Sequence, residues 1–142
     1  MSDAPLRPET SSAVRKTNSG AGRVLVAVYG IFALAATARA SVQILTKFHQ
    51  APLAYLLSAL AALIYIVATV TLARGTRASR RLALIAIIIE LVGVITIGTL
   101  SVLDPEAFPR ATVWSVYGIG YGFVPLVLPI WGLAWLWHTR AP

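Results

Sequence analysis

The residue with the clearest chemical potential in this chain is Glu90, an acid inside a long apolar run. The run covers residues 82–103, follows a pair of arginines, and contains Glu90 as its single charge. A helix of this length spans about 33 Å, which matches a bilayer core of roughly 30 Å. An ionisable group at such depth costs at least ~2.5–3.5 kcal/mol and is usually paired or functional. Glu90 is therefore either a coupling carboxylate for protons or cations, or a structural acid.

Four further residues inside apolar runs are candidates for a polar site together with Glu90: Arg39, Gln43, Tyr55 and Tyr65. If Glu90 is structural, we expect it to be hydrogen-bonded to a tyrosine or serine of the apolar run at residues 53–73, or paired with Arg39. Arg39 lies roughly 10 Å outward of Glu90 on parallel helix axes, so a direct or water-bridged pair is one arrangement. In the other, Arg39 extends outward toward Asp104 and Glu106.

Catalytic constellations are absent from the sequence. It contains no Ser-His-Asp set, no phosphate-binding glycine loop with its lysine, and no HExxH motif. The two histidines, His49 and His138, have no metal-ligand spacing, and cysteine is absent. We therefore expect no enzymatic activity, no metal and no cofactor.

Long apolar runs must position these polar groups. The chain of 142 residues is 58% hydrophobic and 12% charged, whereas a soluble domain is roughly 45–50% apolar and about 25% charged. We predict an all-α, four-helix transmembrane bundle at residues 23–138, with spans at about 24–45, 53–73, 82–103 and 116–137. Residues 1–22 are too polar to bury a core and are predicted to form a disordered basic tail.

The first span has an alternative interpretation. Ala38-Arg39-Ala40 has the form of a signal-peptidase site after an apolar stretch. The polar segment before the apolar stretch is long for a signal peptide, and hydrophobicity resumes after Ser41. We therefore favour an uncleaved transmembrane span.

Basic residues at the ends of the spans predict the orientation. Nine lysines and arginines fall on one side: four at residues 1–23, four in the loop between the second and third spans, and Arg140. Lys47 and Arg110 fall on the other side, so the positive-inside rule places both termini in the cytoplasm of a multi-pass plasma-membrane protein. The four loop arginines are expected to bind anionic lipid headgroups, at about 1 kcal/mol each, and not nucleic acid; they are Arg74, Arg77, Arg80 and Arg81.

Small residues at helical spacing predict where the spans contact one another. The small or polar faces are Gly30, Ala33, Thr37 and Ser41 in the first span; Tyr55, Ser58, Ala62, Tyr65 and Thr69 in the second; and Ala83, Ala86, Glu90, Gly93, Ile97 and Ser101 in the third. In the fourth span, Gly118 and Gly122 form a GxxxG pair that we expect to make the closest helix contact, against Gly93 and Ala86. Pro125 and Pro129 are expected to kink that helix. Its Gly/Pro face is a packing face, a dimer seam, or a broken helix of the kind that lines transporter sites.

Three segments of the sequence carry a family resemblance: Glu90-Leu91-Val92-Gly93-Val94, Asp104-Pro105, and Tyr121-Gly122-Phe123-Val124-Pro125-Leu126-Val127-Leu128-Pro129. They resemble small four-span integral membrane proteins of actinobacteria. The resemblance covers residues 23–137, and it implies a four-helix membrane fold and no activity. In size and span count the chain also resembles small multidrug transporters, whose essential acid lies in the first span, where this chain has Arg39.

Two functions are compatible with this sequence. The first is an interaction or structural subunit of a membrane assembly, packed against itself or against another membrane protein. The alternative is a small proton-coupled transporter that works as a dimer, with Glu90 as the coupling carboxylate. A closed, hydrogen-bonded environment around Glu90 would favour the first function, and a water-lined cavity would favour the second.

Overall fold

The computed structural model describes the backbone of residues 3–139 and the side chains of residues 20–139, and it is 89% helical, with no strand in that range. The elements in chain order are α1 (Asp3–Lys47), η1 (Phe48–Gln50), α2 (Pro52–Arg74), α3 (Arg77–Leu103), η2 (Pro105–Ala107), η3 (Ser115–Tyr121) and α4 (Val124–Thr139). The predicted all-α class is thus confirmed. The predicted disordered tail, residues 1–22, lies mostly outside the residues whose side chains are described, and it stays a prediction.

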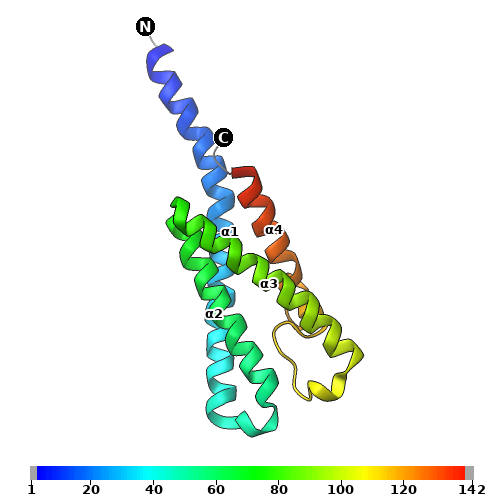
Figure 1. Ribbon diagram of the computed structural model, residues 1–142. Coiled ribbons are helices and arrows are strands. Elements are labelled where there is room, and N and C mark those ends of the chain that lie inside the picture. The colour runs from blue at the N-terminus through cyan, green and yellow to red at the C-terminus, as the bar shows by residue number, and fades with distance from the viewer. Residues whose placement is uncertain (1–2, 140–142) are drawn as a thin grey trace.

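Among the described residues, three helices are long and apolar enough to cross a membrane, and the bent pair of η3 and α4 raises the number to four if it forms one span. Figure 1 shows α1 and α2 side by side, with α3 crossing them and α4 returning along α1. Short connections produce this arrangement, because only two residues separate α2 from α3. Thr76 caps α3 by accepting a hydrogen bond from the Ser79 N–H at 3.2 Å, which satisfies a donor that the first turn of a helix leaves free.

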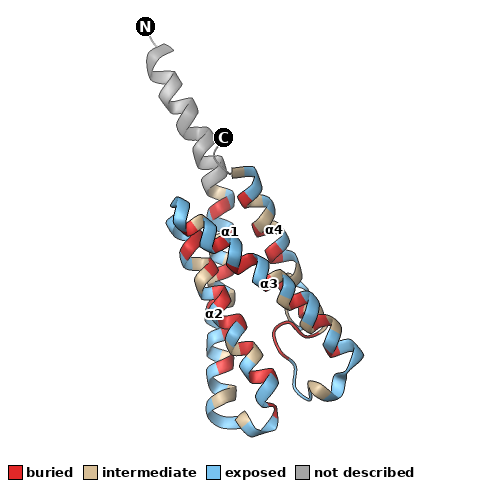
Figure 2. Ribbon diagram, in the orientation of Figure 1, coloured by how far each residue is buried: buried red, intermediate tan, exposed pale blue. Residues whose placement is uncertain are grey.

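The buried faces of α2 and α3 are those that the small-residue pattern predicts. Tyr55, Ser58, Ala62 and Tyr65 are buried along α2, and α3 buries Ala83, Ala86, Glu90 and Ser101. Figure 2 shows the buried residues as stripes on the helices, with exposed residues between them. Small and polar side chains therefore make up much of the interior, together with Ile64, Ile87 and Val94, while most large aliphatic side chains point outward, as expected for helices in lipid.

The buried face of α1 differs from the predicted one. Ala33 is buried as expected, but Thr37 and Ser41 are exposed. The buried positions are instead Leu25, Tyr29, Ala33, Ala36 and Ala40. α1 is therefore rotated so that two of its predicted packing residues remain without an internal partner helix.

The chain re-enters the bundle before the fourth span as a non-helical segment. Thr112, Val113, Trp114 and Ser115 are all buried. Irregular backbone is tolerated at membrane depth only where protein buries it and satisfies its polar groups. Hydroxyl groups do so here: Ser115 Oγ accepts from the Thr112 N–H at 2.8 Å, Thr112 Oγ1 accepts from the Trp114 N–H at 3.1 Å, and Ser101 Oγ accepts from the Val116 N–H at 2.8 Å.

The segment predicted as the fourth span consists of η3 and α4, which are bent by 98° relative to each other, and the bend lies before the prolines. Gly122 and Phe123 both have positive φ angles, +64° and +61°, and they carry the chain into α4. Pro125 sits in the first turn of α4, where a missing N–H costs nothing because that N–H has no intrahelical partner. Left-handed residues therefore make the 98° turn, and Pro129 lies inside α4, where a proline kink stays a prediction.

Gly118 and Gly122 do not form a helix-packing seam. Gly118 has φ +84°, and a Cβ on it would lie 2.6 Å from Cγ of Pro125; a Cβ on Gly122 would have nothing within 4 Å. The close approaches to α3 are made by Trp114 and Tyr117 instead: a Cβ on Gly93 would lie 2.6 Å from Trp114 Cζ3, and a Cβ on Gly98 would lie 2.8 Å from the Tyr117 backbone nitrogen. A rigid indole thus fills the notch at Gly93 where a helix backbone was expected.

Candidate functional site

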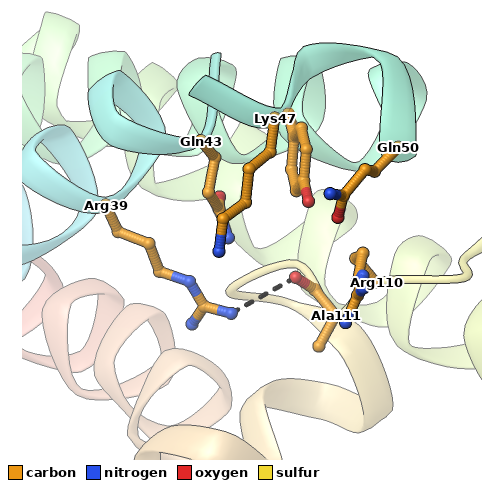
Figure 3. A pocket seen from close by; sticks show the side chains of 7 residues that line it. Arg39, Gln43, Lys47, Gln50, Arg110 and Ala111 are labelled. Carbon is orange, nitrogen blue, oxygen red and sulfur yellow. Dashed lines mark hydrogen bonds between the residues drawn. The ribbon is translucent and has the colours of Figure 1, made fainter. Parts of the chain in front are cut away.

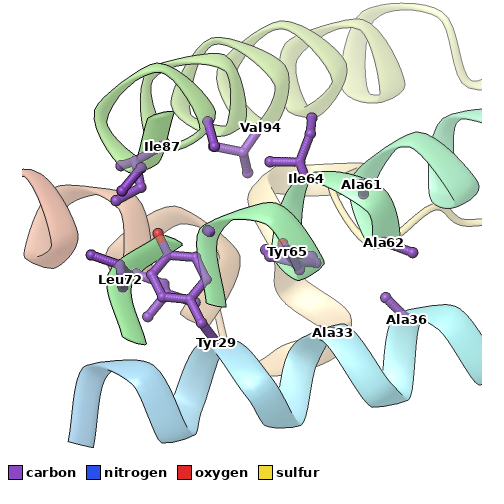
Figure 4. Close-up of a cluster of buried hydrophobic side chains, with 14 of the residues drawn as sticks. Tyr29, Ala33, Ala36, Ala61, Ala62, Ile64, Tyr65, Leu72, Ile87 and Val94 are labelled. Atoms are coloured by element: carbon purple, nitrogen blue, oxygen red, sulfur yellow. The ribbon is translucent and has the colours of Figure 1, made fainter. Parts of the chain in front are cut away.

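The carboxyl group of Glu90 is fully buried in the centre of the bundle. Its Oε1 accepts a hydrogen bond from the hydroxyl of Tyr29 at 2.7 Å. Figure 4 shows Tyr29 rising from α1 toward α3, where Ile87 and Val94 lie. The partner therefore comes from the first helix, and the predicted partners, Arg39 and the tyrosines and serines of the second span, are wrong.

Three helices meet at this carboxyl group. Tyr29 belongs to the buried face of α1, and Glu90 and Ile87 belong to α3. Gly132 brings α4 against them, because a Cβ on Gly132 would lie 3.0 Å from Cδ1 of Ile87 and 3.3 Å from the Tyr29 hydroxyl. A side chain at position 132 would push α4 off the Tyr29–Glu90 pair, so the glycine closes this site from the α4 side.

A layer of aromatic residues continues from Tyr29 across the core. The ring centroids of Tyr29 and Tyr65 are 6.2 Å apart, and those of Phe32 and Tyr65 are 5.8 Å apart. The Trp114 indole N–H donates to the Tyr65 hydroxyl at 3.1 Å. Tyr65 thus lies in the same core as Glu90, where its hydroxyl helps to hold the re-entrant segment in place.

One acceptor at the site remains unused among the described residues. Glu90 Oε2 is buried without a hydrogen-bond partner, as is the hydroxyl oxygen of Ser58. Nearly all buried polar atoms in proteins are satisfied, so an orphan carboxyl oxygen marks a place where a proton or a small donor can be held. The side chain has no exposed surface, however, so that chemistry needs an opening motion.

The remaining predicted polar residues, Arg39, Gln43 and Tyr55, lie together near the C-terminal end of α1. Arg39 donates to the Tyr121 hydroxyl at 2.7 Å and to the Ala111 carbonyl oxygen at 3.4 Å. Gln43 and Tyr55 line a cavity beside it. Arg39 therefore binds the broken fourth span, and the predicted pairing with Glu90, Asp104 or Glu106 is wrong.

Among the four loop arginines, Arg80 has an internal role. It donates to the Leu136 carbonyl at 3.1 Å and to Thr139 Oγ1 at 2.8 Å, and it lies over the Trp135 ring, 5.4 Å from the centroid. A cation at the C-terminus of a helix satisfies free carbonyl groups and complements the helix dipole. The other three, Arg74, Arg77 and Arg81, are exposed.

Sequence reasoning missed Tyr29, Tyr121 and the buried position of Trp114. A signal for Tyr29 was present. It lies six residues, or about 9 Å, from Arg23 at the start of the first span, while Glu90 lies about 12 Å into the third. A tyrosine hydroxyl in lipid needs a partner, and the single buried acid at similar depth was the available one.

Comparison with known proteins adds no assignment: no protein-family model matches the chain, and no curated protein or solved structure matches it. The resemblance to four-span actinobacterial proteins stays a prediction.

Proposed function

We propose that this chain is a small integral membrane protein that acts as an interaction or structural subunit of a membrane assembly. The observation that carries this proposal is an apolar groove of about 360 Å³ between α1 and α2. It is lined by Thr37, Ala40, Ser41, Ile44, Leu45, Ala59, Ala62, Leu63 and Ile66. Small residues at such a surface let the backbone of another helix approach closely, which drives helix association in lipid.

The groove contains the part of the α1 small-residue face that no internal helix covers. Thr37 and Ser41 lie on it and are exposed. Their hydroxyls also provide donors for a neighbouring helix. A membrane helix from a second copy or from another membrane protein is the occupant that fits this chemistry.

The closed state of Glu90 supports a structural role for the acid. It ties α3 to α1 through Tyr29 and is sealed by α4 at Gly132. We further propose that Arg74, Arg77 and Arg81, exposed at one end of the bundle, bind anionic headgroups at the cytoplasmic leaflet, with both termini on that side.

Filling the groove tests the proposal. Thr37→Leu combined with Ser41→Leu should abolish association, because the added branches occupy the space that a partner backbone needs. Ala38→Leu is the matched control, since Ala38 is exposed on the same helix but does not line the groove. Association is measured by energy transfer between labelled copies in nanodiscs and by cross-linking in the source membranes. A wild-type protein that stays monomeric and cross-links to nothing in those membranes would overturn the proposal.

Proton-coupled transport is the second candidate, and it is supported by the broken fourth span together with the unused oxygen of Glu90. Half-helices joined by irregular backbone recur at transporter binding sites. In proteoliposomes, a transporter should carry proton-linked flux that Glu90→Gln removes while the protein still folds. Absence of proton-linked flux in the wild-type protein would exclude this candidate.

A further inference from the structure

A second polar site lies at the α1–α2 turn, away from Glu90 and from the apolar groove. It is a cavity of about 270 Å³. Its lining residues include three cations, two amides and one phenol: Arg39, Lys47, Arg110, Gln43, Gln50 and Tyr55. Figure 3 shows Arg39, Gln43 and Lys47 projecting from α1 toward the loop that carries Arg110 and Ala111.

The charge of this cavity is entirely positive. None of its lining residues is acidic, and the buried acid of the described chain, Glu90, is held by Tyr29 in the bundle centre. Cations gathered around one space repel one another unless an anion joins them. A partly enclosed space with charge of one sign concentrates the oppositely charged ligand.

Arg39 is pre-positioned to receive such an anion. Tyr121 and Ala111 each take one of its N–H groups, and a guanidinium has five, so three remain for a ligand. Arginine binds phosphate-type oxygens with two parallel hydrogen bonds, and lysine binds them as a point charge. Because Arg39 is already anchored to the broken span, little side-chain freedom is lost when a ligand binds.

Gln43 favours a ligand that can donate a hydrogen bond to its side-chain oxygen. Its Oε1 is buried and has no hydrogen-bond partner among the described residues. An oxyanion that also carries a hydroxyl group, such as hydrogen phosphate or a glycerol-bearing headgroup, satisfies the cations and this acceptor together. A liquid water occupies about 30 Å³, so the cavity has room for a phosphate group with part of its hydration shell.

We propose that the cavity lined by Arg39, Lys47 and Arg110 binds an oxyanion of the phosphate class, supplied by the free ion or by a phospholipid headgroup. The cavity opens where α1 ends and the chain turns, at the edge of the apolar spans. This position is reachable both from water and from the headgroup layer. The site is independent of the helix-docking groove, so either proposal can fail without the other.

The test uses the full-length protein and two probes. In the first arm, inorganic phosphate is titrated into protein in an uncharged detergent, with chloride at matched ionic strength, and the thermal midpoint is followed. In the second arm, the protein is placed in nanodiscs of phosphatidylcholine with or without phosphatidylglycerol, and lipid retention is measured by native mass spectrometry. Lys47→Gln and Arg110→Gln are the site variants, because both residues line the cavity and are exposed, so their replacement leaves the core intact.

We expect saturable protection by phosphate or selective retention of phosphatidylglycerol, weakened about tenfold by each site variant, the usual effect of losing one charge-assisted hydrogen bond. Arg23→Gln, which replaces an exposed cation far from the cavity on α1, should bind as the wild type does. A response to phosphate in detergent identifies a free oxyanion, and a response to phosphatidylglycerol alone identifies a headgroup. Equal protection by chloride, or equal binding by the site variants and Arg23→Gln, would overturn the proposal.

Discussion

Removing the Tyr29 hydroxyl should destabilise the bundle, and only while Glu90 is present. Polar contacts between membrane helices average about 0.6 kcal/mol and reach about 1.7 kcal/mol, because the unfolded chain in the membrane also finds partners. The Tyr29–Glu90 bond belongs at the upper end. It is 2.7 Å long, fully buried, and joins residues 61 positions apart on different helices. Without the hydroxyl, neither oxygen of Glu90 has a partner, since Oε2 already lacks one among the described residues. We therefore expect Tyr29→Phe to cost about 1–1.7 kcal/mol.

A double-mutant cycle measures this coupling. In a Glu90→Leu background, Tyr29→Phe should cost less than about 0.3 kcal/mol, because removing both partners of a buried bond leaves no orphan group. Tyr55→Phe is the matched control, since Tyr55 is an equally buried tyrosine that lines the distant cavity, and its cost should be the same in both backgrounds. The assay is reversible unfolding in mixed micelles, which reports the free energy of unfolding. If Tyr29→Phe costs the same with and without Glu90, the pair does not hold α1 to α3 and the structural role of Glu90 fails.

Two further predictions concern the fourth span. Gly118→Ala should lower the free energy of unfolding by about 1–3 kcal/mol, because the residue has φ +84° and its Cβ would collide with the Pro125 ring. The control is Gly120→Ala, whose Cβ meets nothing within 4 Å and which should leave the melting midpoint in detergent unchanged. Equal midpoints for the two variants would contradict the left-handed turn. Arg80→Gln should lower the free energy of unfolding by about 0.5–1.5 kcal/mol and speed amide exchange in the last turn of α4, since it removes the bonds to the α4 terminus; exposed Arg81→Gln should do neither, and similar exchange in both variants would refute the contact.

Local sequence information was enough to place α2 and α3 and to say which of their faces turn inward. The second span was predicted at 53–73, and α2 is Pro52–Arg74; the third was predicted at 82–103, and α3 is Arg77–Leu103. Helix length, apolarity and small-residue spacing are properties of one segment at a time, so they can be read without knowing the neighbours. The burial of Glu90 also follows from local information, because lipid cannot solvate an acid at that depth.

Tertiary contacts set which polar groups meet and where the fourth span breaks. Glu90 binds Tyr29 and Arg39 binds Tyr121, choices that depend on how α1, α3 and α4 are rotated against one another. Trp114 packs into the space above Gly93, and the chain then turns into α4 through the positive φ angles of Gly122 and Phe123. These outcomes depend on how side chains from distant parts of the chain fit together at close-packed density, and the hydrophobicity of a single segment contains no information about that fit.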